Sequence, residues 1–170
     1  MLNRREFLTA FKKPLESSKQ RIYIRPPYAK DISSFQNRCI ECDSKACATS
    51  CEEKIIVISA DGTPILNFSK SGCTFCEECA RACESDVLTL DELENEQIDA
   101  KITIDPNLCV SHHGVICFSC KEPCIDDAIL FNGMFNPVID DEICTGCGFC
   151  ISRCPANAIS SEPFLRGDRS

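Results

Sequence analysis

The sequence contains no tryptophan, and it has only 2 tyrosines and 10 phenylalanines among 170 residues. A large aromatic binding surface is therefore excluded. Long hydrophobic runs are lacking as well. The longest aliphatic run, Ile55 to Ile58, is far shorter than the roughly 18 apolar residues that a membrane-spanning helix requires. We expect a soluble protein without a membrane span.

The patterns of common enzymes and export signals are also missing. The chain has no Gly-rich nucleotide loop and no Ser, His and carboxylate arrangement of the hydrolytic kind, so we expect that it is not an enzyme. Arg4-Arg5 resembles a twin-arginine export motif, but Lys12-Lys13-Pro14 interrupts the place where an apolar h-region would follow. We therefore expect a cytoplasmic protein whose N-terminal segment is not cleaved.

Charge is unevenly distributed along the chain. Residues 1–30 carry 8 Lys and Arg against 2 Glu, a net charge of +6, and the whole chain carries −8, so the remaining residues carry −14. The strong negative charge of the residues after residue 30 argues against nucleic acid as a partner. The basic arm is either a solubilising tail or a docking segment, and the sequence does not decide between them.

Cysteine, in contrast, is abundant, with 16 residues. The stretch from Cys144 to Pro155 has the form C-x2-C-x2-C-x3-C-P, which in bacterial ferredoxins holds [4Fe-4S] clusters. Gly146 and Gly148 leave room for backbone N–H groups to approach the cysteine sulfurs. We therefore take this stretch as a cluster-binding motif.

The motif recurs three more times with altered spacing, and the four copies use every cysteine. Such a complete division into fours predicts four [4Fe-4S] clusters. Structural zinc sites usually have pairs of cysteines about 12 to 20 residues apart, unlike the tight spacing here. The predicted ligands are Cys39, Cys42, Cys47 and Cys51 of motif one; Cys73, Cys76, Cys79 and Cys83 of motif two; Cys109, Cys117, Cys120 and Cys124 of motif three; and Cys144, Cys147, Cys150 and Cys154 of motif four.

Apolar segments around the motifs predict the fold. An apolar pair follows every motif, and a second β-like piece precedes motifs two, three and four. Turn sequences at 60–63 and 132–135 join two of these pairs of segments, which predicts hairpins. The acidic stretch 93–99 is too charged for a strand and predicts a linker. Because the cysteines make up part of the hydrophobic residues, the apolar core is thin, and we expect the apo form to be largely unfolded.

The predicted fold is α+β: two tandem bacterial-ferredoxin-like 2[4Fe-4S] units with short helices and small antiparallel sheets. The expected organisation is a basic arm and Pro linker (1–30), a unit with motifs one and two (31–92), an acidic linker (93–99), a unit with motifs three and four (100–162) and a C-terminal tail (163–170).

In ferredoxins the fourth cysteine of each motif ligates the neighbouring cluster. An alternative is that motif one pairs with four and motif two with three. Pairing motif one with two and motif three with four instead predicts these ligand sets: Cys39, Cys42, Cys47 and Cys83; Cys73, Cys76, Cys79 and Cys51; Cys109, Cys117, Cys120 and Cys154; Cys144, Cys147, Cys150 and Cys124.

Motif three departs from the others because its first spacing is lengthened to seven residues and contains both histidines, His112 and His113. No cysteine is missing there, so we expect a surface loop, with partner recognition as a possible use, rather than histidine ligation.

Several of these features together resemble one family. The Arg-Arg start, the Ile24-Arg-Pro-Pro27 segment, the order of the four motifs and the stretched third motif are similar to the NapF family of ferredoxin-type proteins, which are encoded with the periplasmic nitrate reductase. The resemblance implies a cytoplasmic four-cluster protein that associates with the molybdenum-containing catalytic subunit before export and assists its maturation, by cluster assembly or reduction. The x4 spacing in motif one departs from the simpler form.

Three functions are thus open: a redox-active accessory protein, an assembly chaperone whose clusters are structural, and an electron-transfer subunit of a respiratory oxidoreductase. Stable membrane association would favour the third.

Overall fold

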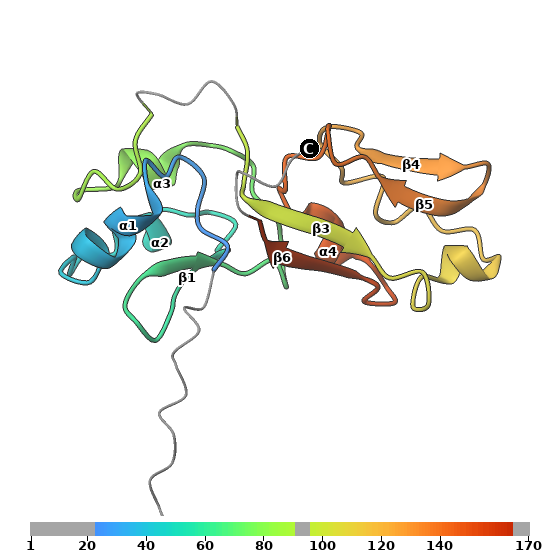
Figure 1. Cartoon of the computed structure of the whole chain (residues 1–170), viewed down its shortest axis with the longest axis horizontal. Helices are drawn as coiled ribbons and strands as arrows, with labels where there is room; N and C mark the ends of the chain where they lie inside the picture. Colours follow the sequence, from blue (N-terminus) through green and yellow to red (C-terminus); the bar gives the residue numbers. More distant parts are fainter. Residues whose placement is uncertain (1–22, 91–95, 165–170) are drawn as a thin grey trace, which may run out of the picture.

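The computed structural model describes residues 23–90 and 96–164, called here the first half and the second half (Figure 1). It has short helices and small two-stranded antiparallel sheets, as predicted. The elements are α1 (Ile32–Ser34), a π-helical turn (Phe35–Cys39), α2 (Ala46–Thr49), β1 (Ile56–Ile58), β2 (Pro64–Leu66), α3 (Glu78–Arg81), β3 (Ala100–Ile104), a 3-10 helix (Val110–His113), β4 (Ile129–Asn132), β5 (Phe135–Ile139), α4 (Phe149–Arg153) and β6 (Ile159–Pro163).

Both predicted hairpins are confirmed. In the first, Ile56 of β1 pairs with Leu66 of β2, and the Thr63 amide donates to the Asp61 carboxylate over 3.1 Å inside the turn. Hydrogen bonds to its carboxylate lower the pKa of Asp61 to about 2, and the bond from the Ser59 hydroxyl has the largest effect. In the second hairpin, β4 and β5 pair in antiparallel register with an irregularity between Phe131 and Asn132.

A third sheet joins β3 to β6, with Ala100 opposite Pro163 and Ile104 opposite Ile159. It lies between the β1–β2 hairpin and the β4–β5 hairpin (Figure 1). The sequence predicted both segments as strands but did not predict that they pair.

The four motifs end in the same turn. The residue three positions after the last cysteine has a positive φ of 50 to 54°, and its amide donates to the carbonyl of that cysteine. The apolar pair that follows then points inward, and all eight of its side chains in the four copies are buried. The turn residues are Lys54, Asp86, Asp127 and Asn157.

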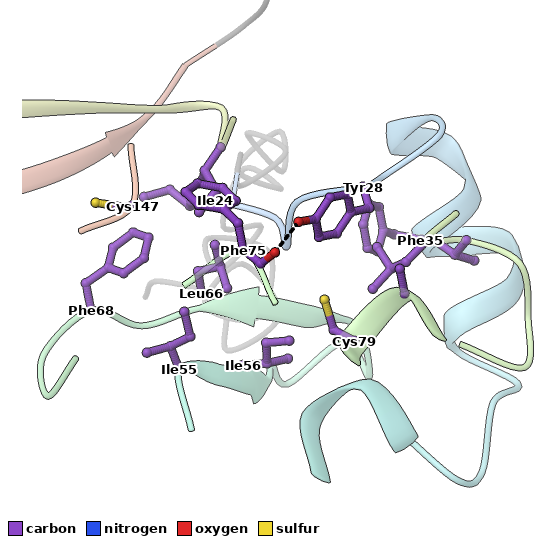
Figure 2. Packing of buried hydrophobic residues seen from close by; sticks show 14 of the residues in the cluster. Ile24, Tyr28, Phe35, Ile55, Ile56, Leu66, Phe68, Phe75, Cys79 and Cys147 are labelled. Atoms are coloured by element: carbon purple, nitrogen blue, oxygen red, sulfur yellow. Dashed lines mark hydrogen bonds between the residues drawn. The ribbon is translucent and has the colours of Figure 1, made fainter. Parts of the chain in front are cut away.

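The Pro-containing segment is part of the core of the first half. The amide of Leu66 donates to the carbonyl of Ile24 over 2.9 Å, and the buried Tyr28 hydroxyl donates to the carbonyl of Phe75 over 2.9 Å (Figure 2). Ala29 forms an isolated bridge with Leu88. Because Tyr28 is only 5% exposed, this segment packs as a core element. The rest of the basic arm, including Arg4-Arg5, lies outside the described residues.

Two buried clusters form the core. The first contains Tyr28, Phe35, Phe68 and Phe75, and it also takes in Cys147 of the second half (Figure 2). The second is built on Ile102, Ile129 and Ile159 with two buried cysteines. Ala100 and Ile151 pack against both clusters, so the two halves share a continuous interior.

Backbone contacts connect the halves at one junction. The amide of Cys73 donates to the carbonyl of Cys147 over 2.7 Å. Within the second half, the amide of Ile98, whose side chain belongs to the first buried cluster, donates to the carbonyl of Thr145 over 2.9 Å. Ile98 is 2% exposed. The end of the predicted acidic linker is thus packed against the loop of motif four, while residues 91–95 lie outside the described ranges.

Glycines allow this close approach. A Cβ atom on Gly72 would lie 2.5 Å from the backbone nitrogen of Phe149, and one on Gly148 would lie 2.3 Å from the Phe68 ring. Real Cβ atoms do not come so close to other heavy atoms, so side chains at either position would push the halves apart. Within the ranges that the structure describes, no helix is both long enough and apolar enough to cross a membrane.

Candidate iron-sulfur sites

The cysteines are presented by irregular loops that end in short helices. In three motifs the third cysteine lies within a helix: Cys47 in α2, Cys79 in α3 and Cys150 in α4. The fourth cysteine comes after the helix ends, so it is displaced from the first three. This local geometry separates the last cysteine from the rest of its own motif.

Motifs two and four have the same backbone with different residues. Phe75 and Glu77 have φ values of 54° and 65°, and the corresponding Gly146 and Gly148 have φ values of 73° and 83°. Residues other than glycine rarely adopt this left-handed region, at a cost of about 1–2 kcal/mol each. The Phe75 side chain is buried in the first cluster, and its packing offsets part of that cost.

Three cavities are each lined by four cysteines from two motifs. Motif one contributes Cys51 to the cavity with Cys73, Cys76 and Cys79. Motif four contributes Cys154 to the cavity with Cys109, Cys117 and Cys120. Motif three contributes Cys124 to the cavity with Cys144, Cys147 and Cys150.

The remaining four cysteines form a group of their own. Burial raises the pKa of Cys39 and of Cys47, and Cys83 lies close enough to both to raise it as well, as does Cys42. We number the groups by the motif that supplies three cysteines. Group one thus receives its fourth cysteine from motif two, group two from motif one, group three from motif four and group four from motif three.

The groups follow one another in a row. Cys47 of group one acts electrostatically on Cys79 of group two. Cys73 of group two bonds through its amide to the carbonyl of Cys147 in group four. Cys120 of group three acts on Cys150 of group four. The spatial order is therefore one, two, four, three, and groups two and four meet at the junction of the halves.

Burial dominates the protonation of the thiols in these groups. Burial first, with a contribution from the nearby Cys51, raises the pKa of Cys73 and of Cys79 to about 12. Burial likewise raises the pKa of Cys120 to about 11. Cys42 is an exception, because a hydrogen bond with the Ser44 hydroxyl at 3.6 Å lowers its pKa. Deprotonating the buried thiols needs a nearby positive charge, which a bound metal supplies.

Backbone amides also point at the sulfurs. The amides of Phe75, Leu88 and Ala158 donate to the sulfurs of Cys73, Cys83 and Cys154 over 3.4, 3.4 and 3.3 Å. Such bonds stabilise negative charge on sulfur and help to set the reduction potential of an iron-sulfur cluster.

These donor sets can be tested against the kind of metal group they fit. In the part of the chain that the structure describes, no three or more His, Cys, Asp or Glu side chains are placed to hold a single metal ion. In three of the four groups, four cysteines together line a cavity. Four cysteine thiolates around a space are the donor set of a [4Fe-4S] cluster, so the residues present fit that group.

The lengthened part of motif three is a folded loop. Residues Val110–His113 form a 3-10 helix that ends at Gly114. The ring nitrogens Nε2 of His112 and His113 lie 3.2 and 3.1 Å from the carbonyl oxygens of Pro137 and Asn107. The ring of His112 thus contacts the backbone of β5, and that of His113 contacts the segment before Cys109.

Sequence reasoning missed the side chains whose role depends on packing. Tyr28 belongs to a segment that reads as a linker, and its contact with Phe75 comes from distant residues. Ser111 is 1% exposed beside group three, but a lone serine next to a cysteine is too common to single out. Ser44, which bonds Cys42, escaped notice for the same reason.

Comparison with known proteins places the cysteine groups in a family. Residues 137–160 match the family described as the 4Fe-4S binding domain. This match, with the cysteine groups, defines the chain as a ferredoxin-type iron-sulfur protein.

Relatives extend the match to most of the chain. The ferredoxin-type protein NapF of Escherichia coli K12 is 35% identical over 143 residues, which cover 82% of this chain and 84% of that protein. NapF of Haemophilus influenzae is 32% identical over 151 residues, with 85% and 82% covered. The chain therefore belongs to the NapF family, as the sequence motifs predicted.

Proposed function

We propose that this chain is a cytoplasmic protein carrying four [4Fe-4S] clusters that associates with the molybdenum-containing catalytic subunit of periplasmic nitrate reductase and assists its maturation before export. The observation that carries the proposal is the gathering of the cysteines into four groups of four, in a chain of the NapF family.

In this proposal each group holds one cluster, with three ligands from one motif and one from its partner motif. The ligand sets are those expected for tandem pairing: Cys39, Cys42, Cys47 and Cys83; Cys73, Cys76, Cys79 and Cys51; Cys109, Cys117, Cys120 and Cys154; Cys144, Cys147, Cys150 and Cys124. Residues 31–92 and 100–162 are then two ferredoxin-like units. The exchange of fourth cysteines within each half supports this arrangement.

When bound, the clusters would supply one-electron redox chemistry. The residues of the chain have three tasks. The cysteines hold the metal, and the amides of Phe75, Leu88 and Ala158 donate to cysteine sulfurs. The packing around Cys79 and Cys150, each 8% exposed, keeps water from part of each site. None of these tasks requires the chain to transform a substrate.

Association with another protein is supported by the surface of the second half. Nine of the fourteen large hydrophobic side chains that are exposed in the described residues lie there. Exposed apolar side chains close to a redox site favour contact with a partner protein. They are Leu108, Val115, Ile116, Phe118, Ile125, Leu130, Met134, Val138 and Ile143.

Purification without oxygen, followed by analysis of iron, acid-labile sulfide and zinc and by EPR after reduction, tests the cofactor. We expect about sixteen iron and sixteen sulfide per chain, as four [4Fe-4S] clusters require. Stoichiometric zinc with little sulfide would contradict the proposal. Tagged protein with full iron should also retain the catalytic subunit from an extract made without oxygen, and Cys109→Ala, which lacks one cluster, serves as the comparison. Failure of the iron-loaded protein to retain that subunit would contradict the proposed association.

Double substitutions test which cysteines share a cluster. Because Cys109 and Cys154 belong to one proposed set, Cys109→Ala with Cys154→Ala should lose about four iron atoms, no more than either single variant. Cys109→Ala with Cys124→Ala changes two cysteines of the same motif but of different sets, and should lose about eight. A loss of about eight iron atoms in both double variants would favour the nested pairing of motifs, because Cys109 then shares a cluster with neither Cys154 nor Cys124.

A further inference from the structure

Ser111 has an unusual environment. Its Oγ is buried and has no hydrogen-bond partner, and it is the one buried side-chain nitrogen or oxygen atom of the described residues in this state. The residue is 1% exposed, so bulk water does not satisfy the hydroxyl. Leaving such a group unpaired costs about 1–3 kcal/mol, which makes a partner supplied by another bound group favourable.

The position of Ser111 identifies that partner. Ser111 lies in the 3-10 helix two residues after Cys109, and it lines the cavity of group three. The rest of the lining is largely apolar apart from the four cysteines and Ser119, whose Oγ lies 3.6 Å from the Cys117 sulfur. Ser111 therefore borders a space that four cysteines also line, and its hydroxyl has no hydrogen-bond partner in the protein.

We propose that Ser111 donates its hydroxyl hydrogen to a sulfur of the cluster held by Cys109, Cys117, Cys120 and Cys154, and that this bond raises the reduction potential of that cluster. The proposal rests on the proposed function, because it requires a [4Fe-4S] cluster in group three. A donor to sulfur stabilises the reduced form, since one added electron increases the negative charge on the sulfurs.

The feature is specific to group three. The residue two positions after the first cysteine is Glu41 in motif one, Phe75 in motif two and Gly146 in motif four, and none of these carries a hydroxyl. Only the lengthened spacing of motif three folds this position into a 3-10 helix against the cavity. The loop thus gives one of the four sites a donor that the corresponding positions lack, and the potentials should differ accordingly.

The test is an EPR-monitored redox titration of oxygen-free protein with full iron. Ser111→Ala should lower one of the four potentials, with about a tenfold smaller equilibrium constant for reduction, or about 59 mV for a one-electron couple. Ser152→Ala is the control, because Ser152 lies in α4 between two cysteines but its hydroxyl donates to the carbonyl of Phe149 over 3.3 Å. It should leave all four potentials unchanged.

A second pair of variants covers the case in which Ser111→Ala does not retain its cluster. Ser111→Thr and Ser111→Val fill nearly the same volume and differ in the hydroxyl, so the Thr variant should keep the higher potential and the Val variant should not. Equal potentials in these two variants, or unchanged potentials in Ser111→Ala with full iron, would overturn the inference. Iron far below sixteen atoms in the unaltered protein would instead contradict the proposed function.

Discussion

The two halves of the chain are built on the same motif, but their interiors differ. The first half surrounds aromatic rings, including Tyr28, Phe35, Phe68 and Phe75. The buried cluster of the second half contains three isoleucines and two cysteines, and most of the exposed large hydrophobic side chains of the described ranges lie there. The first half thus has more apolar packing of its own, while the second half relies more on its cysteine groups and on the junction. A shared cysteine pattern does not imply equal stability.

The largest effect should come from removing an aromatic ring of the first half. Phe35 is fully buried, so Phe35→Ala should cost about 4 kcal/mol and lower the urea midpoint for cluster loss. Phe118→Ala removes the same group from the second half, where Phe118 is 39% exposed and its ring packs tilted against that of Phe131 with centroids 4.8 Å apart, and should cost about 1 kcal/mol. Equal midpoints for the two variants would remove the proposed difference between the halves.

A smaller effect should come from separating the halves at the junction. Gly148→Ala places a Cβ against the Phe68 ring at a φ of 83°, so overpacking adds to backbone strain, for a total of about 3 kcal/mol. Gly133→Ala introduces the same side chain at a φ of 72° with no atom within 4 Å, and should cost only the strain, about 1 kcal/mol. Urea midpoints measured without oxygen compare the two. Should they be lowered equally, the junction would not limit stability.

The smallest effect concerns one hydrogen bond in the first half. Tyr28→Phe leaves the Phe75 carbonyl without the donor that now lies 2.9 Å away, at a cost of about 1 kcal/mol. Burial raises the pKa of Tyr28, so the hydroxyl stays protonated and donates throughout the neutral range. Tyr23→Phe is the control, since it keeps the ring over which the Arg25 guanidinium lies at 5.2 Å. The midpoints of thermal unfolding of the two variants should differ by the same amount at every pH from 6 to 8. A pH-dependent gap would mean that another group titrates with Tyr28.

Local sequence patterns were enough to predict the strands and hairpins. Contacts between residues far apart in the sequence were not predicted. The apolar pairs and turn sequences were sufficient for both hairpins, because each hairpin lies within about a dozen residues. The pairing of β3 with β6 was not predictable, since Thr103 and Ser160, whose hydroxyls lie 3.1 Å apart, are separated by 57 positions. The Pro-containing segment reads as a spacer, and only packing places Tyr28 in the core. The cysteine ligands are a prediction from spacing alone, whereas the hydroxyl of Ser111 becomes noticeable only through its burial.

The row of cysteine groups also has a consequence for the order in which the protein is made. Groups one and two are complete once residues up to Cys83 have emerged from the ribosome, since Cys51 of motif one joins group two and Cys83 of motif two joins group one. Groups three and four stay incomplete until Cys154 and Cys150 emerge. The bond from the Cys73 amide to the Cys147 carbonyl forms only then. During synthesis from the N-terminus, both cysteine groups of the first half are therefore complete before motif four exists. Until then the edge that carries Cys73 has no partner from the second half.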